Sequence, residues 1–343
     1  MRAAPAGRQP PRRIPTQRTA QAGAALLAAM LTVTLVATFA AAALWQQWRT
    51  VEVEAADRSR VQSSWILTGA QDWARLILRE DFRAGQQDHL AEPWAVPLQE
   101  ARLSTFLAAD QNNNADTGDA DNVFLSGEIQ DLQAKLNLTT MVNAGVLHPE
   151  WAETFRRLFE VLGLPSQEYS RLAENMRFAA DISIDNRNAA RAPLMPQRLE
   201  QVVWLGVSPA TAAALEPYVT VLPTTSTMVN INTAPAEVIY AVGQALTLGD
   251  AKRIVAEREQ RHFQQVDEAE RLLPPFEGPV PGKHFHPGRV SVSSRFFEVR
   301  GRLRMDDVVI EERSIMHREG PRVRTVQRER GGFEPFTPQA PRR

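Results

Sequence analysis

Oxygen-bearing side chains recur at alternate positions in one polar stretch of this chain, residues 110–122. Carboxylate and amide oxygens at such spacing are the ligands that calcium prefers in protein loops. Ala115 stands where a calcium loop needs a glycine for its sharp turn. A solvated polar loop is therefore the favoured interpretation, and calcium binding is the alternative. The candidate ligands are Asp110, Asn112, Asn114, Asp116, Asp119 and Asp121.

No other group of residues has the spacing of a catalytic site. The chain has no cysteine, which excludes thiol nucleophiles, disulfides and thiolate metal sites. Ser126 and Ser293 lack a histidine or an acid at a spacing typical of a nucleophilic serine. The histidines are scattered, and only His284 and His286 lie close enough to suggest an incidental metal site. We therefore expect a protein without enzymatic activity.

The N-terminal segment has the layout of a membrane anchor. No charged residue occurs from Ala22 to Trp45, and residues 24–44 are long enough to cross a bilayer as a helix. Trp45 and Trp48 suit the membrane interface at its far end. The arm before it holds only basic charges, which predicts a cytoplasmic N-terminus and an external remainder. These charges are Arg2, Arg8, Arg12, Arg13 and Arg18.

Gly23 lies at the junction of the basic arm and the apolar run and is a candidate processing site. A cleaved secretory signal peptide is the alternative. The apolar core of such a peptide is usually only ~7–15 residues long and ends at a small-residue cleavage site. Here the run is longer and continues into a polar helix, so an anchor that stays attached is favoured.

The first helix continues without proline through residues 50–81. Apolar residues recur there at helical spacing, which predicts one face packed on a core. A helix over residues 24–79 would be ~80 Å long. The predicted buried face consists of Val51, Ala55, Val61, Trp65, Ile66, Ala70, Trp73 and Ile77.

Two groups of predicted strands bracket a block of helices. Alternating patterns predict strands at 123–131 and 132–138, and again at 289–304 and 307–316. The intervening residues are almost wholly helical in pattern, which indicates an inserted helical domain. Its first helices are predicted at 151–162, 166–178, 197–204 and 209–215.

Residues 229–261 carry the pattern of a helix-hairpin-helix. Thr233 can cap the first helix, Pro235 suits its first turn, and Glu237 is close to a capping-box position. Such hairpins often hold duplex DNA through backbone amides, so a membrane-anchored DNA-binding protein of the competence type is an alternative function. The glycine-rich turn that offers those amides is poorly represented, because Gln-Ala-Leu-Thr-Leu separates Gly243 from Gly249. The net charge of −1 adds no global signal for nucleic acid.

The order of these features resembles one family, the minor pseudopilins called general secretion pathway protein K of bacterial type II secretion systems. The resemblance covers almost the whole chain. It implies an α+β pilin-like fold, in which a long N-terminal helix packs on an antiparallel sheet. A large inserted all-α domain would contain the helix-hairpin-helix, or SAM-like, unit. The residues on which the resemblance rests are the Gly23-Ala24 junction, residues 125–133 with Asn137-Leu138, the hairpin at 229–234 with Arg258, and Phe-Phe-Glu-Val at 296–299.

This resemblance also implies a domain organisation. The predicted parts are a basic leader (1–23), the apolar half of the first helix (24–45), two parts of a pilin-like domain (46–138 and 289–317) and an inserted helical domain (139–288) with its hairpin at 229–261. The tail at 318–343, rich in arginine, glycine and proline, is expected to be disordered.

The family implies cleavage by prepilin peptidase between Gly23 and Ala24, followed by N-methylation of Ala24. Most pilin-like subunits carry a glutamate as the fifth residue after the cut, whereas Ala28 stands there in this chain, as is typical of the K family. A carboxylate within an apolar helix is costly unless it is paired. In other subunits that carboxylate is thought to neutralise the terminal amine of the neighbouring subunit. A subunit with nothing docked above it has no such amine to neutralise, so we expect this chain at the tip of the pseudopilus.

The implied role is to initiate pseudopilus assembly, cap the fibre and limit its length. The expected partners are the minor pseudopilins I, J and H, the major pseudopilin G, the inner-membrane secretion platform, prepilin peptidase and membrane lipid, with no nucleic acid. The expected location is the bacterial inner membrane, crossed once, with a cytoplasmic N-terminus and a periplasmic C-terminal domain. After assembly that domain would lie at the pseudopilus tip.

Calcium sites of the family draw partly on an acidic segment before the hairpin. That segment is compressed here to residues 180–197, where Asp181 and Asp185 remain. Calcium is the one cofactor considered, and its candidate ligands are Asp110, Asp116, Asp119, Asp121, Asp181 and Asp185.

Overall fold

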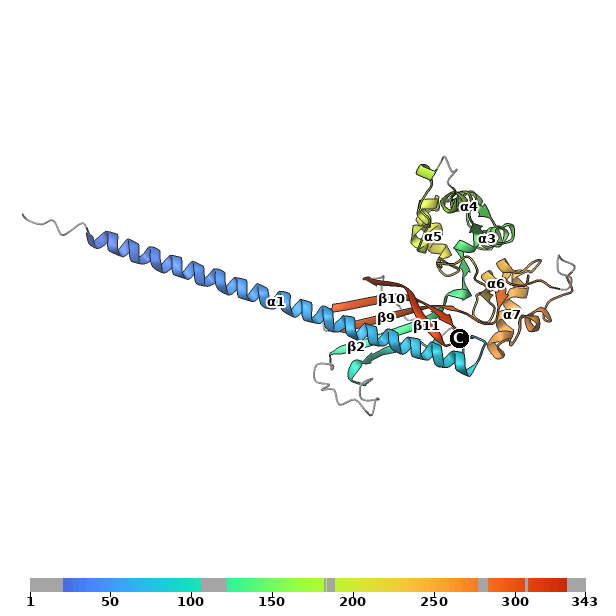
Figure 1. Cartoon of the computed structure of the whole chain (residues 1–343), viewed down its shortest axis with the longest axis horizontal. Coiled ribbons are helices and arrows are strands. Elements are labelled where there is room, and N and C mark those ends of the chain that lie inside the picture. The colour runs from blue at the N-terminus through green and yellow to red at the C-terminus, as the bar shows by residue number, and fades with distance from the viewer. Residues whose placement is uncertain are drawn as a thin grey trace, which may run out of the picture. The chain divides into compact units, whose positions relative to one another are not determined.

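A computed structural model describes residues 21–105, 122–181, 183, 189–276, 283–305 and 308–331. The chain divides into two compact units, Met1–Ser64 and Trp65–Arg343. Helix α1 (Gln21–Ala84) is one continuous helix (Figure 1). The prediction of a single long N-terminal helix is therefore confirmed.

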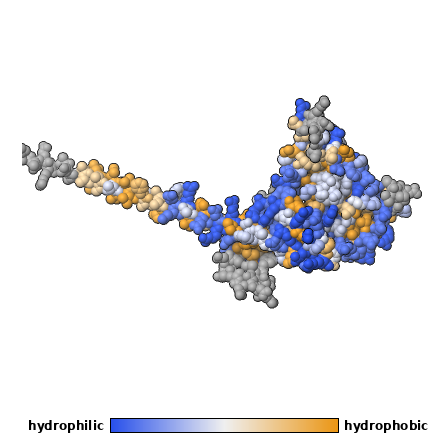
Figure 2. Space-filling view, in the orientation of Figure 1, coloured by the Kyte–Doolittle hydropathy of each residue, from blue (hydrophilic) through white to orange (hydrophobic). Residues whose placement is uncertain are grey.

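In the first unit α1 starts with an exposed apolar stretch. It is long and apolar enough to cross a membrane, and none of its most apolar stretch is buried inside the protein. Figure 2 shows apolar side chains along this part of the helix. The hydroxyls of Thr32, Thr34 and Thr38 each donate to the carbonyl oxygen three residues earlier. Such bonds would satisfy the hydroxyls in a bilayer, where water cannot do so.

In the second unit α1 buries only part of the predicted face. Leu67, Gln71, Ala74 and Leu78 are buried at helical spacing. Trp65 and Trp73, predicted to be buried, are 72% and 48% exposed. The prediction was wrong for the two tryptophans because this helix has apolar residues on two faces. The predicted Ile66, Ala70 and Ile77 do pack against the core. The sheet selects the face of smaller side chains, which lets the helix approach closely.

One antiparallel sheet packs against this part of α1. Its strands run in the order β1-β2-β9-β10-β11. Inward-facing residues of β2 and β9, such as Leu125 and Leu303, are directly paired and contact Leu67 of α1. Farther along α1, Leu78 packs against Phe297 and other residues of the sheet. The strands are β1 (Leu98–Arg102), β2 (Val123–Asp131), β9 (Phe296–Met305), β10 (Val308–Glu319) and β11 (Arg322–Gly331).

The structure confirms three strands predicted from the sequence, β2, β9 and β10, whereas β1 and β11 were not predicted. The run at 132–138 is not a strand of this sheet, because it forms turns and the short strand β3 (Leu136–Asn137), which pairs with β6 (Val219–Thr220). The expectation of disorder after residue 317 is wrong for β11, which pairs along β10. Arg328 and Arg330 of β11 both bind Glu312, whose side chain is fully buried. Charges that suggested a solvated tail are therefore neutralised by the neighbouring strand.

Two glycines stand opposite each other in the central strands, and their surroundings differ. Gly127 of β2 stands opposite Gly301 of β9. A Cβ on Gly301 would lie 3.5 Å from Leu67 Cδ2, which is an ordinary contact, whereas a Cβ on Gly127 would lie 2.7 Å from the backbone oxygen of Arg300. Only the second contact requires the backbone to move.

Gly127→Ala is therefore expected to lower the free energy of unfolding by about 1–3 kcal/mol, the usual cost of overpacking. Gly301→Ala is the matched control on the partner strand and should cost less than about 1 kcal/mol. Urea unfolding of the two soluble domains, followed by circular dichroism, measures both values. Equal losses in the two variants would contradict this explanation.

The helical block lies in the chain between β2 and β9 and has its own core. Its helices are α3 (Pro149–Val161), α4 (Ser166–Ala180), α5 (Pro209–Leu215), α6 (Ala236–Val242), α7 (Leu248–Gln260) and α8 (Val266–Glu270). The segment predicted as a helix at 197–204 is the 3-10 helix η6 (Leu199–Leu205). Phe155, Leu158, Met176 and Ile254 are almost completely buried together. The predicted α+β fold with a helical domain is confirmed.

Shorter elements connect these parts. The 3-10 helices are η1 (Pro93–Ala95), η3 (Leu132–Ala134), η4 (Leu138–Met141) and η5 (Ala189–Arg191). The remaining two-residue strands are β4 (Val142–Asn143), β5 (Val146–Leu147), β7 (Val229–Asn230) and β8 (Val290–Ser291). The parallel pair β7–β8 joins the start of the hairpin to the segment that leads into β9.

Candidate functional site

The predicted processing residues lie in the first turns of α1. Gly23, Ala24 and Ala28 are exposed, and a Cβ on Gly23 would meet no atom within 4 Å. The fold therefore places no steric demand on Gly23. Any requirement for glycine at this position must come from a partner that acts on it, such as a peptidase.

An exposed apolar face lies on the second-unit part of α1, opposite the buried stripe. It consists of Trp65, Trp73 and Leu76, which are 72%, 48% and 43% exposed. Gly69 lies between the two tryptophans and has open space around it. We call these four residues the aromatic face. Large exposed aromatic side chains are typical of surfaces that bind another protein. The sequence placed both tryptophans in the core, so this face was missed.

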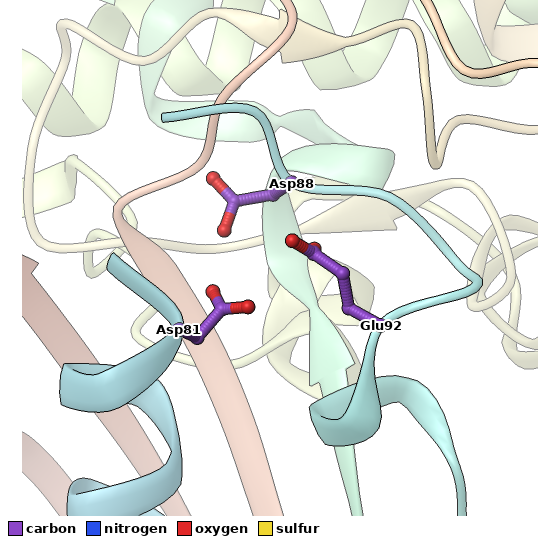
Figure 3. Close-up of side chains that lie close together, drawn as sticks. All are labelled: Asp81, Asp88 and Glu92. Carbon is purple, nitrogen blue, oxygen red and sulfur yellow. The ribbon is translucent and has the colours of Figure 1, made fainter. Parts of the chain in front are cut away.

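At the end of α1, three carboxyl groups point toward one another (Figure 3). Asp81, Asp88 and Glu92 each offer an oxygen within 4.8 Å of the others. Arg318 of β10 binds this group, donating to Asp81 Oδ2 at 2.8 Å and also to Asp88. Its guanidinium further donates to the carbonyl oxygen of Ser294 at 2.9 Å. The cluster therefore already holds a cation, contributed by the chain itself.

Burial dominates the electrostatics of this cluster. Desolvation raises the pKa of Asp81 to about 6, although Arg318 opposes the change. It also raises the pKa of Asp88, with Arg318 again opposing, and the pKa of Glu92. Each shift has the direction expected when a carboxylate leaves water.

A second buried group links the cluster to the helical domain. Asp131, at the end of β2, accepts hydrogen bonds from Thr233 Oγ1 at 2.6 Å and Ser294 Oγ at 2.6 Å. The side-chain amide of Asn230 lies 3.1 Å from Asp131 Oδ2 and 3.0 Å from the carbonyl oxygen of Asp88. We call the two linked groups the polar joint. Its members are Asp81, Asp88, Glu92, Asp131, Asn230, Thr233, Ser294 and Arg318.

The polar joint corrects one sequence prediction. Thr233 does not cap the first hairpin helix, since α6 begins at Ala236 after Pro235 and Thr233 donates to Asp131 instead. The Asn-Thr-Ala turn is held from its other side by Arg258, which donates to the carbonyl oxygens of Ile231 and Ala234. Burial lowers the pKa of Arg258 to about 10. These motif residues therefore attach the hairpin to the sheet.

The hairpin turn itself has little left to offer a phosphate group. The amide of Gln244 donates to the carbonyl oxygen of His284 at 2.8 Å, and the amide of Thr247 donates to Asp250 at 3.1 Å. Arg157 covers the same turn by donating to carbonyl oxygens of Gly243 and Leu246. These engaged groups disfavour the DNA-binding alternative.

Comparisons with known proteins agree with this architecture. Two models described as type II secretion system protein K match residues 134–224 and 229–283. The chain is 26% identical over 350 residues to type II secretion system protein K of Pectobacterium carotovorum subsp. carotovorum, covering 94% of this chain and 100% of that protein. The protein of the same name from Pseudomonas aeruginosa is 26% identical over 339 residues, covering 92% of this chain and 91% of that one. These matches confirm the resemblance of the chain to type II secretion system protein K.

A solved structure shares the fold. It is the crystal structure of the GspK-GspI-GspJ complex from the type 2 secretion system of enterotoxigenic Escherichia coli. The matched chain gives a TM-score of 0.62 at 21% identity, over 81% of this chain and 99% of that one. The recognition of a minor pseudopilin from its sequence motifs is thus confirmed, and the protein is a structural component of a secretion system with a helix suited to single-pass anchoring.

The calcium candidates do not come together among the described residues. Asp181 lies at the end of α4 and accepts hydrogen bonds from the backbone amide and hydroxyl of Ser183. These hydrogen bonds lower the pKa of its carboxyl. The other candidates, Asp110, Asp116, Asp119, Asp121 and Asp185, lie outside the described residues. Calcium binding therefore stays a prediction.

The two neighbouring histidines are engaged separately. The ring nitrogens of His284 lie 2.8 Å from the carbonyl oxygen of Gln244 and 2.9 Å from that of Pro274. His286 instead bonds to the carbonyl oxygen of Pro287. Because both nitrogens of His284 face backbone carbonyls, that side chain holds three segments together, and the suggested metal site at this pair is not supported.

Proposed function

We propose that this protein is a minor pseudopilin at the tip of the type II secretion pseudopilus, where it starts assembly, caps the fibre and limits its length. The observation that carries the proposal is the helical block inserted between β2 and β9 of a pilin-like fold. Such an insertion would clash inside a tight helical stack but has room at a tip. Ala28 adds support, because no carboxylate is present there to neutralise the amine of a subunit above.

The proposal includes a defined maturation. Prepilin peptidase would cut between Gly23 and Ala24, and Ala24 would be methylated. The basic arm would stay in the cytoplasm and the domain after Trp48 would lie in the periplasm, as its charge distribution favours. The span would anchor the protein in lipid until the secretion platform moves it into the fibre. Its role there is structural, without catalysis.

The proposed partners are minor pseudopilins I and J, then H and the major pseudopilin G. The first two are suggested by the complex in which the fold relative was solved. We place the contact with I and J on the aromatic face, where an apolar partner helix could cover Trp65 and Trp73 and lie close to the backbone at Gly69. Small residues between larger ones permit such close helix packing.

Trp65→Ala with Trp73→Ala is expected to weaken the complex with purified I and J domains at least about 30-fold, as for interface hot spots. Analytical ultracentrifugation and calorimetry on the soluble domains, starting near Trp48, measure this. Trp204→Ala is the matched control, since Trp204 is 50% exposed on the helical domain. If the unmodified domain does not associate with I and J, the proposed function is contradicted. If Trp204→Ala weakens the complex as much as the double variant, the interface is not confined to the aromatic face.

A further inference from the structure

We propose that the polar joint is a proton-controlled attachment of the helical domain to the pilin-like sheet, tight when Asp81 and Glu92 share a proton and looser when they lose it. The joint is the place where both halves of the pilin-like domain meet the hairpin. Asn230 and Thr233 come from the hairpin, and Asp81, Asp131 and Arg318 come from α1 and the sheet.

The first argument is charge. Within the described part of the chain, the joint brings together four carboxyl groups and one guanidinium, that of Arg318. Asp88 and Asp131 are 1% and 5% exposed. Buried charges without a partner are strongly unfavourable. One arginine cannot balance four carboxylates, so binding a proton stabilises the folded joint.

The second argument is geometry, which locates the proton. Asp81, Asp88 and Glu92 each place a carboxyl oxygen within 4.8 Å of the others. Carboxylates crowded into one site raise one another's pKa, which favours a proton shared among them. Glu92 accepts hydrogen bonds from the backbone amide of His89 and from Trp94 Nε1, both at 2.8 Å. These fixed donors hold Glu92 in place beside Asp81.

The sign of the pH dependence follows from burial. Desolvation raises the pKa of Asp81 from 3.8 to about 6, and burial likewise raises the pKa of Asp131 to about 6. The folded joint therefore keeps protons that the unfolded chain has lost. This stabilisation is fully present below the unfolded pKa and is lost as pH rises through about 6.

The histidines beside the joint act in the opposite direction. The ring of His89 stacks on that of His262 with centroids 3.7 Å apart. Burial lowers the pKa of both, so the stack persists as neutral rings and weakens as pH falls. Loosening with rising pH must therefore come from the carboxyl groups. The charged and titratable groups around the joint are Asp81 from α1, Asp88, His89 and Glu92 from the following loop, Asp131 from β2, His262 after α7 and Arg318 from β10.

Hydrogen exchange of the full chain in detergent micelles tests the proposal. The amides of Val229 and Ile231, which donate to the carbonyl oxygens of Arg289 and Ser291, report on the hairpin side of the joint. After correction for the intrinsic pH effect, their exchange should be about tenfold faster at pH 7.5 than at pH 5, with a midpoint near 6. Asp81→Asn, which mimics the protonated group, should show a smaller acceleration between the two pH values, because only Asp131 then keeps a pKa of about 6. Asp72→Asn is the control on the same helix and should behave like the unmodified protein.

Any of three results would overturn the proposal. The first is an exchange rate that does not change with pH in the unmodified chain, and the second is an Asp81→Asn profile identical to that of the unmodified chain. The third is protection restored at pH 7.5 by added calcium, which would make a metal ion the occupant. Glu92→Gln provides the second variant if Asp81→Asn does not fold, and the profile of the unmodified chain decides if neither folds. This test is independent of the pseudopilin partners.

Discussion

Replacement of Arg318 by alanine is expected to lower the free energy of unfolding of the second unit by about 3–5 kcal/mol, the usual cost of removing one partner of a buried ion pair. The guanidinium is almost completely buried and binds Asp81, Asp88 and two backbone carbonyl oxygens. It also lies 4.8 Å from the ring centroid of Phe297. Its loss leaves two buried carboxyl groups without their cation.

Urea unfolding of the soluble domain at pH 7.5 measures this loss. Arg324→Ala is the matched control, because Arg324 lies on the next strand and its ion pair with Glu319 is largely exposed. That variant should cost less than about 1 kcal/mol. Adding Asp81→Asn and Asp88→Asn to Arg318→Ala should recover part of the stability, since no buried carboxylate then lacks a partner. A loss no larger than in the control would show that the joint does not depend on Arg318.

Gly23→Val is expected to leave the protein uncleaved in the inner membrane and to abolish secretion through this system. The variant cannot act through the fold, because a Cβ at Gly23 meets no neighbouring atom. A branched side chain beside the cleaved bond would instead obstruct the peptidase. The mobility of the membrane-bound protein on gels and mass spectrometry of its N-terminus measure the processing step.

Ala40→Val is the control for this second prediction, since it places the same side chain on the same apolar helix away from the junction. It should be cleaved normally, with the mature chain beginning at Ala24. Normal cleavage of Gly23→Val would refute the proposed processing site. An uncleaved control would show instead that any added bulk in the helix prevents processing.

Local sequence patterns determined much of the architecture. The apolar run before Trp45, the alternation in β2 and β9, and the helical spacing of α3 and α4 were all recognised because each depends on residues close in the chain. The order of short motifs then indicated the family, although none is specific alone. The processing residues remain a prediction made from their position in the chain, since the fold places no steric demand on Gly23.

Tertiary structure decided what depends on distant partners. The buried face of α1 was chosen by the sheet, since both faces of the helix are apolar and the sheet covers only the one with Leu67, Ala74 and Leu78. Strand β11 exists because the buried Glu312 neutralises arginines that the sequence alone suggests are solvated. The polar joint pairs Arg318 with Asp81 across 237 positions of chain. Local spacing contains no information about such a contact, because its energy arises only when folding removes both charges from water.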